Sequence, residues 1–197
     1  PLLRLSLWNR GIRGIILAYH AGDDEPIDMD WDRFSAIGIS HYFPSIRVNR
    51  IMTNAVHMIR LAISKMEEHG CERIGLAVPE KGNLVSDYQF SGEYLNYYFQ
   101  QAPANRIPPF MEGPEKWTAN HFGSWLKRYR PDAVIGFGFG AKEWIEGNGH
   151  KIGKTIQFVQ FGVQPESTVK HHGIDQQPYA GGQMLAETLI RQINTNQ

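Results

Sequence analysis

Short apolar runs alternate with segments of helical periodicity along most of the chain. The short runs at 12–18, 37–43, 73–78, 132–137 and 156–161 are mostly apolar, and this predicts strands buried on both faces. Helical periodicity is found at 2–8, 53–69, 87–101, 117–129, 142–146 and 178–193. Strands that alternate with helices in this way predict an α/β fold with parallel, Rossmann-like sheets. Such sheets bind ligands at the carboxyl ends of their strands.

The helical period is clearest at 53–69, where Gly70 stands at the position of a helix-ending glycine. The apolar residues that recur there at helical spacing are Val56, Ile59, Ala62, Ile63 and Met66. The pattern therefore predicts a helix that packs one face against a sheet.

Composition and charge exclude several classes of protein. The chain carries 20 Lys and Arg against 20 Asp and Glu, so it lacks the basic surplus of a domain that binds nucleic acid alone. There is no apolar run of 18 residues, so no membrane span is expected. Cys71 is the single cysteine, which excludes an internal disulfide and favours a reducing, cytoplasmic location.

Metal sites are not indicated. The neighbours His171 and His172 are poorly spaced for chelation on one helix, and no paired Cys/His motif occurs. The acidic residues between 23 and 32 lack the glycine and closing glutamate of a calcium loop, so they predict a solvated loop.

The most enzyme-like feature is the segment 136–141 (GFGFGA), which follows a predicted strand and precedes a helix. It fits the loose form of the dinucleotide fingerprint. The acidic residue that should follow about 20 positions later is missing, and Phe137 and Phe139 are too bulky for a phosphate cradle. A tight turn between strand and helix is the better interpretation, and no cofactor is predicted.

The segment 87–101 is rich in aromatic residues, more than one helix face can bury. They are Tyr88, Phe90, Tyr94, Tyr97, Tyr98 and Phe99. Two interpretations stay open: rings that stack on a neutral, polyhydroxylated ligand, or an aromatic helix at a dimer interface.

The segment 53–78 (TNAVHMIRLAISKMEEHGCERIGLAV) resembles the effector domains of the LacI/GalR family of bacterial transcription regulators. The family shows Asp-Asn, a helix, Gly-His, a basic residue and an Ile-rich strand there. Further landmarks follow in the same order: 13–17 (RGIIL), 89–94 (QFSGEY), 131–135 (PDAVI) and 174–193, which is similar to the family's closing hinge and helix. The resemblance spans nearly the whole chain.

The resemblance implies a periplasmic-binding-protein-like fold of two Rossmann-like lobes with a cleft between them. Residues 1–50 and 164–197 would form part of the amino-terminal lobe, which would be incomplete in this chain, and residues 51–163 the carboxy-terminal lobe. The helix-turn-helix that reads DNA would be absent from this chain. The connections between lobes would lie near 48–54 and 162–176.

The departures from the family pattern concern the ligand. The Asp of Asp-Asn is Thr53, the His of Gly-His is Cys71, and the effector-contacting Arg is Gln89. The Asn-Asp pair after the Pro-x-Ala strand falls on 138–139 and the next strand's Gly-Phe/Tyr-Asp on 160–162. Charged groups that hold sugars are thus replaced by amides and aromatic rings, which implies an altered ligand or a vacant site.

The sequence therefore predicts a non-enzymatic effector-binding and dimerisation domain of a DNA-binding transcription regulator. It would sense a small, possibly carbohydrate, effector as a homodimer and reach operator DNA through the absent amino-terminal domain. The residues expected to contact the ligand are Tyr19, His20, Gln89, Phe139 and Gln176. The alternatives are a solute-binding protein of transport or chemosensing, a dinucleotide-dependent enzyme, and a degenerate domain kept for dimerisation.

Overall fold

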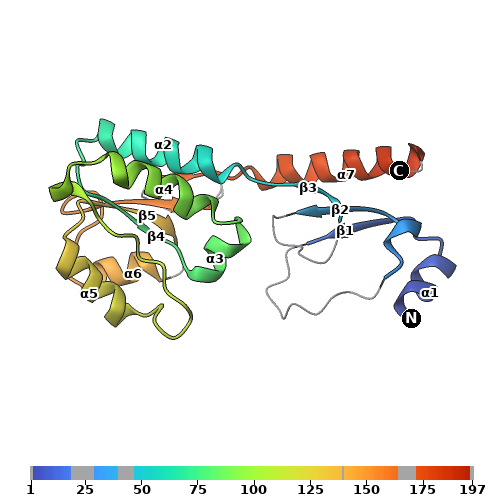
Figure 1. Cartoon of the computed structure of the whole chain (residues 1–197), viewed down its shortest axis with the longest axis horizontal. Helices are drawn as coiled ribbons and strands as arrows, with labels where there is room; N and C mark the ends of the chain where they lie inside the picture. The colour runs from blue at the N-terminus through green and yellow to red at the C-terminus, as the bar shows by residue number, and fades with distance from the viewer. Residues whose placement is uncertain (1, 19–28, 40–46, 139, 164–171, 196–197) are drawn as a thin grey trace. The chain divides into compact units, whose positions relative to one another are not determined.

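The computed structural model describes residues 2–18, 29–39, 47–138, 140–163 and 172–195. The chain divides into two compact units, residues 1–53 with 177–197 (the first unit) and residues 54–176 (the second unit). Figure 1 shows the chain coloured from its amino to its carboxyl end.

The first unit contains a parallel sheet of three described strands in the order β1-β2-β3. Helix α7 packs on one face, where Ile37 is buried with Leu185 and Leu189. A Cβ on Gly14 would lie 2.6 Å from Ile193, so only glycine lets the helix approach β1 this closely. The elements are α1 (Leu2–Asn9), β1 (Gly14–Leu17), η1 (Trp31–Arg33), β2 (Ser35–Ile39), β3 (Asn49–Ile51) and α7 (Pro178–Thr195).

The second unit contains a parallel sheet in the order β4-β5-β6-β7, with a hydrophobic core on each face. Figure 1 shows α2 and α4 on one side of β4 and β5, and α5 and α6 on the other. The strands are β4 (Ile74–Ala77), β5 (Ala133–Phe137), β6 (Gln157–Phe161) and β7 (His172–Ile174). The helices are α2 (Ala55–Glu68), α3 (Glu80–Val85), α4 (Gln89–Gln100), η2 (Pro103–Asn105), α5 (Ala119–Tyr129) and α6 (Ala141–Gly147).

Local signals explain where α2 begins and ends. The Asn54 side chain accepts a hydrogen bond from the His57 backbone N–H at 2.9 Å, which caps the first turn. Gly70 has φ +79°, a left-handed conformation that glycine adopts without strain, and it ends the helix. The apolar stripe between these ends is buried against the sheet.

The predicted α/β class and the two parallel sheets are confirmed. The five predicted strands overlap β1, β2, β4, β5 and β6. Strands β3 and β7 and helix α3 were not predicted. No helix in the described ranges is both long and apolar enough to cross a membrane.

Candidate functional site

The candidate site lies in the second unit, at the carboxyl ends of its strands. The four strands are parallel, so these ends share one edge of the sheet. The segments that leave this edge contain Gly138 after β5, Gly162 after β6 and Gln176 after β7. None of these three residues carries a charge.

Three phenylalanine rings cluster where these strands end. Phe90 of α4 stacks on Phe161 with ring centroids 5.1 Å apart, and it meets Phe137 edge to face at 5.4 Å. Phe137 and Phe161 are 5.5 Å apart. Phe90 and Phe161 are buried, whereas Phe137 is only half-buried. The cluster can offer an apolar, aromatic surface to a ligand.

Two glutamine amides lie beside glycines at the same edge. A Cβ on Gly138 would fall 2.6 Å from the Gln160 side chain, so the glycine leaves room for that amide. Gln176 lies next to Gly162, and its Nε2 is 3.7 Å from the sulfur of Met58 on α2. Both glutamines are half-buried. Neutral amides can donate and accept hydrogen bonds, as a hydroxylated ligand requires.

Gln89 is held at the start of α4 by a strained turn. Asp87 and Tyr88 have φ of 54° and 59°, a left-handed conformation that is uncommon for residues other than glycine. Asn83 stabilises this turn, because its carbonyl accepts from the Tyr88 N–H at 2.9 Å and its side-chain oxygen accepts from the Ser91 N–H at 3.1 Å. Its side-chain amide also donates to the Ser91 hydroxyl at 3.0 Å.

The glycines of segment 136–141 make room for protein atoms. A Cβ on Gly136 would fall 2.1 Å from the carbonyl oxygen of Ala77. A Cβ on Gly140 would fall 2.7 Å from the Trp144 ring. The close approach of backbone and side chains accounts for these glycines, as the tight-turn interpretation predicts.

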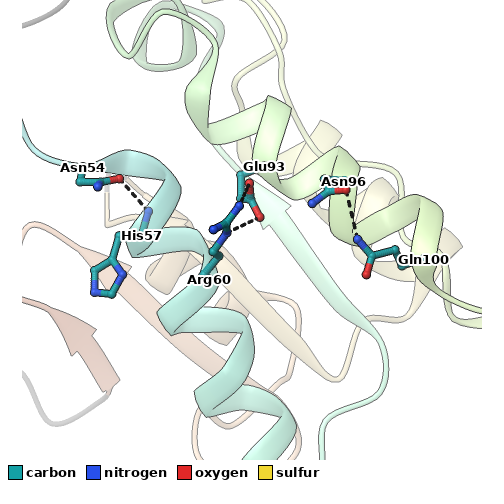
Figure 2. A network of polar contacts seen from close by, with 6 residues as sticks. All are labelled: Asn54, His57, Arg60, Glu93, Asn96 and Gln100. Atoms are coloured by element: carbon teal, nitrogen blue, oxygen red, sulfur yellow. Dashed lines mark hydrogen bonds and ion pairs between the residues drawn. The ribbon is translucent and has the colours of Figure 1, made fainter.

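A polar network on α2 and α4 links the two helices away from the sheet (Figure 2). The Arg60 guanidinium donates to both carboxylate oxygens of Glu93, at 2.8 and 3.1 Å. Arg60 holds the pKa of the Glu93 carboxyl below its ordinary value. Asn96 and Gln100 form a further contact at 3.1 Å along α4. The network joins surface side chains and has the geometry of a structural contact.

Two titratable groups of the second unit's core have raised pKa values. Burial raises the pKa of the Cys71 thiol, which keeps it protonated and a poor nucleophile. Burial also raises the pKa of Tyr97 to about 12. In the described part of the chain, no three His, Cys, Asp or Glu side chains come together as metal ligands would.

The structure places two of the five predicted ligand residues. Gln89 begins α4 and Gln176 follows β7, both in the second unit. Tyr19, His20 and Phe139 lie outside the described residues. Gln160 and Phe161 were not among the expected ligand residues, although the resemblance matched 160–162 to a ligand-holding motif and the rule that ligands bind at the ends of parallel strands points to both.

Among the comparisons with known proteins, only the one with solved structures found matches. No protein-family model matches the chain, and no curated protein matches it. Solved structures do match. A regulatory protein of the LacI family from Chloroflexus aggregans has a TM-score of 0.71 and 13% identity, over 99% of this chain and 74% of that one.

Two further matching structures were solved with a bound ligand. The lac repressor dimer bound to operator and the anti-inducer ONPF has a TM-score of 0.69 and 18% identity, over 98% of this chain and 70% of that one. The transcriptional regulator CelR in complex with cellobiose has a TM-score of 0.70 and 14% identity, over 100% and 64%. The fold is therefore of the periplasmic-binding-protein type. More narrowly, it is the fold of LacI-family transcription regulators.

Proposed function

We propose that this chain is the effector-binding domain of a LacI-family transcription regulator that senses a small, uncharged molecule. The observation that supports this most directly is the edge of the second sheet, where aromatic rings and neutral amides adjoin at the strand ends. This is the edge where sheets of this type bind ligands. The proposal includes no catalytic step.

The chemistry of the edge favours a neutral ligand with hydroxyl groups. Phe137 offers a ring face for stacking on C–H groups, and Gln160 and Gln176 offer amides for hydroxyls. CelR was solved with cellobiose, a ligand of this chemical kind. Gln89, at the start of α4, is the third amide of the proposed site.

In this proposal, regulation requires two partners: operator DNA and a second copy of the protein. The lac repressor was solved as a dimer on its operator. The present chain has equal numbers of acidic and basic residues, so in this proposal a separate segment binds the operator. In this proposal the effector shifts an equilibrium between two conformations of the domain, whose lobes are the two compact units. The regulator acts as a cytoplasmic homodimer. Light scattering on the purified chain tests the dimer, which a monomer at micromolar concentration would contradict.

The experiment for the site is a binding screen followed by paired variants. Ribose, cellobiose and adenosine are titrated into the wild-type chain by calorimetry and thermal shift, since a ligand that binds the folded state stabilises it. For the probe that binds, Gln176→Ala and Gln89→Ala should each weaken affinity by about five- to tenfold, the value of one neutral hydrogen bond.

The matched control is Gln100→Ala, at the opposite end of the helix that Gln89 begins. Gln100 donates to Asn96 on the helix surface, so its loss should leave the affinity unchanged. Binding that survives both Gln89→Ala and Gln176→Ala would place the ligand elsewhere.

A further inference from the structure

Gln192 is a buried polar residue of α7 whose side-chain oxygen lacks a partner. Its relative exposure is 8%, and within the described part of the chain Oε1 has no hydrogen-bond donor. Buried acceptors are nearly always paired, because an unpaired acceptor loses its bond to water and gains nothing. A buried acceptor of this kind marks a place where a donor is expected.

Gln192 lines a cavity of about 540 Å³ in the first unit. The cavity lies at the amino ends of β2 and β3, since Phe34 and Ala36 line it beside the start of β2 and Val48 and Asn49 beside the start of β3. The candidate site of the second unit lies on the other sheet, and it lies at the carboxyl ends of the strands rather than the amino ends. The volume of the cavity falls within the range of small-molecule sites.

The lining combines cationic and apolar side chains. Among the described lining residues, Arg47 and Arg50 contribute two guanidinium groups and Asp32 contributes one carboxylate. A guanidinium matches the geometry of a carboxylate or phosphate with two parallel hydrogen bonds. Trp31 and the buried Phe34 supply apolar side chains.

We propose that this cavity binds a small hydroxylated organic anion, a sugar phosphate or a hydroxycarboxylate. Its anionic group would lie against the arginines, and a hydroxyl would donate to Gln192 Oε1. The site would be separate from the candidate site of the second unit, so the chain could bind two molecules. The assignment does not depend on the proposed function.

The experiment uses the whole chain with ribose 5-phosphate, gluconate and ribose as probes. Ribose 5-phosphate or gluconate should bind in low salt. Binding of the first would identify the ligand as a sugar phosphate, and binding of the second would identify it as a hydroxycarboxylate. Ribose should not bind here, because it lacks the anionic group. Arg47→Gln should weaken binding at least tenfold and reduce its dependence on salt.

Gln192→Met separates a binding role from a structural role. Methionine has nearly the same shape and no unpaired oxygen, so the variant should melt at a higher temperature without ligand. It should also bind the anion about five- to tenfold more weakly, because one neutral hydrogen bond is lost. A residue that only supported the fold would give a lower melting temperature.

Arg191→Gln is the matched control. Arg191 is the exposed neighbour of Gln192 on α7 and does not line the cavity, so the affinity should stay unchanged. Three results would overturn the proposal: no binding of either anion, a destabilised Gln192→Met, or equal losses in Arg47→Gln and Arg191→Gln. Gln89→Ala and Gln176→Ala should leave anion binding intact, which keeps this test apart from that of the effector site.

Discussion

Tyr94 shows how one buried hydroxyl holds two segments of the second unit together. Its side chain is fully buried, and its hydroxyl lies 2.9 Å from the carbonyl oxygen of Ile74 and 2.6 Å from that of Ile107. Burial raises its pKa far above the ordinary value, so the group stays a neutral donor.

We expect Tyr94→Phe to reduce the free energy of unfolding by about 1–3 kcal/mol, because the variant leaves buried carbonyl oxygen without its donor. Urea denaturation followed by circular dichroism measures this. Tyr98→Phe, a half-buried position on the same helix, is the control and should change stability less. Equal effects would mean that the two carbonyl contacts contribute nothing.

The lowered pKa of Glu93 predicts that the stability of the fold depends on pH. Its pKa is lowered, chiefly by the hydrogen bond from Arg60, so the folded state favours the carboxylate more than the unfolded state does. The stabilisation is present above the ordinary glutamate pKa of about 4.3 and is lost as pH falls through the lower, folded value. The difference in melting temperature between wild type and Glu93→Gln should therefore be constant near neutral pH and shrink below about pH 4.

Arg60→Gln provides the check on this interpretation. It should show the same pH dependence as Glu93→Gln, and the double variant should lose no more than either single one. The side chain of Arg60 is 64% exposed, so added salt should also reduce the difference. Additive losses would show that the two residues act independently.

At the scale of elements, two glycines of the second unit have opposite roles. Gly92 lies within α4 and a Cβ there would meet no atom within 4 Å, whereas a Cβ on Gly136 in β5 would meet the Ala77 carbonyl oxygen at 2.1 Å. Gly92→Ala should raise the free energy of unfolding by about 0.5–1 kcal/mol, since alanine loses less backbone freedom in a helix.

Gly136→Ala should instead destabilise the chain by about 2 kcal/mol or more, because β4 and β5 must separate to admit the methyl group. Chemical denaturation of both variants checks the pair. If Gly136→Ala were neutral, β4 and β5 would not approach as closely as the structure has them.

The elements that could be predicted are those with a complete local signal. The helix expected at 53–69 is α2, because an apolar stripe, an Asn cap and a terminal glycine all agree there. Strand β3 has one apolar residue in three, and β7 reads His-Gly-Ile, so each forms only because a neighbouring strand pairs with it. Pairing across long sequence separations leaves no periodic pattern within a short segment.

The candidate site was less predictable than the fold for a related reason. Gln89 and Gln176 were chosen from strand-end position together with the family resemblance; Gln89 begins α4 and Gln176 follows β7. The contact of Phe90 with Phe161 joins residues 71 positions apart, and only the packing of α4 on the sheet brings these rings together. The cavity beside Gln192 depends likewise on a helix and a sheet from opposite ends of the chain.

At the scale of the whole molecule, the two units differ in how their sheets are covered. In the second unit, β4 is buried at every residue and large apolar clusters cover both faces. In the first unit, β3 is largely exposed and one cluster is centred on Ile37, Leu185 and Leu189. Local opening costs less where fewer apolar contacts are broken.

Amide hydrogen exchange should therefore show that the second unit resists opening more than the first. We expect the slowest amides in β4, β5 and β6, with exchange set by unfolding of the second unit, and faster exchange in β1 to β3. Leu185→Ala should accelerate exchange in the first unit and leave β4 to β6 unchanged, whereas Phe158→Ala should accelerate exchange in β4 to β6 and leave the first unit unchanged, because each unit opens separately. Equal protection in the two sheets would mean that the chain opens as one cooperative body, and each effect of Leu185→Ala would then appear in β5 as well.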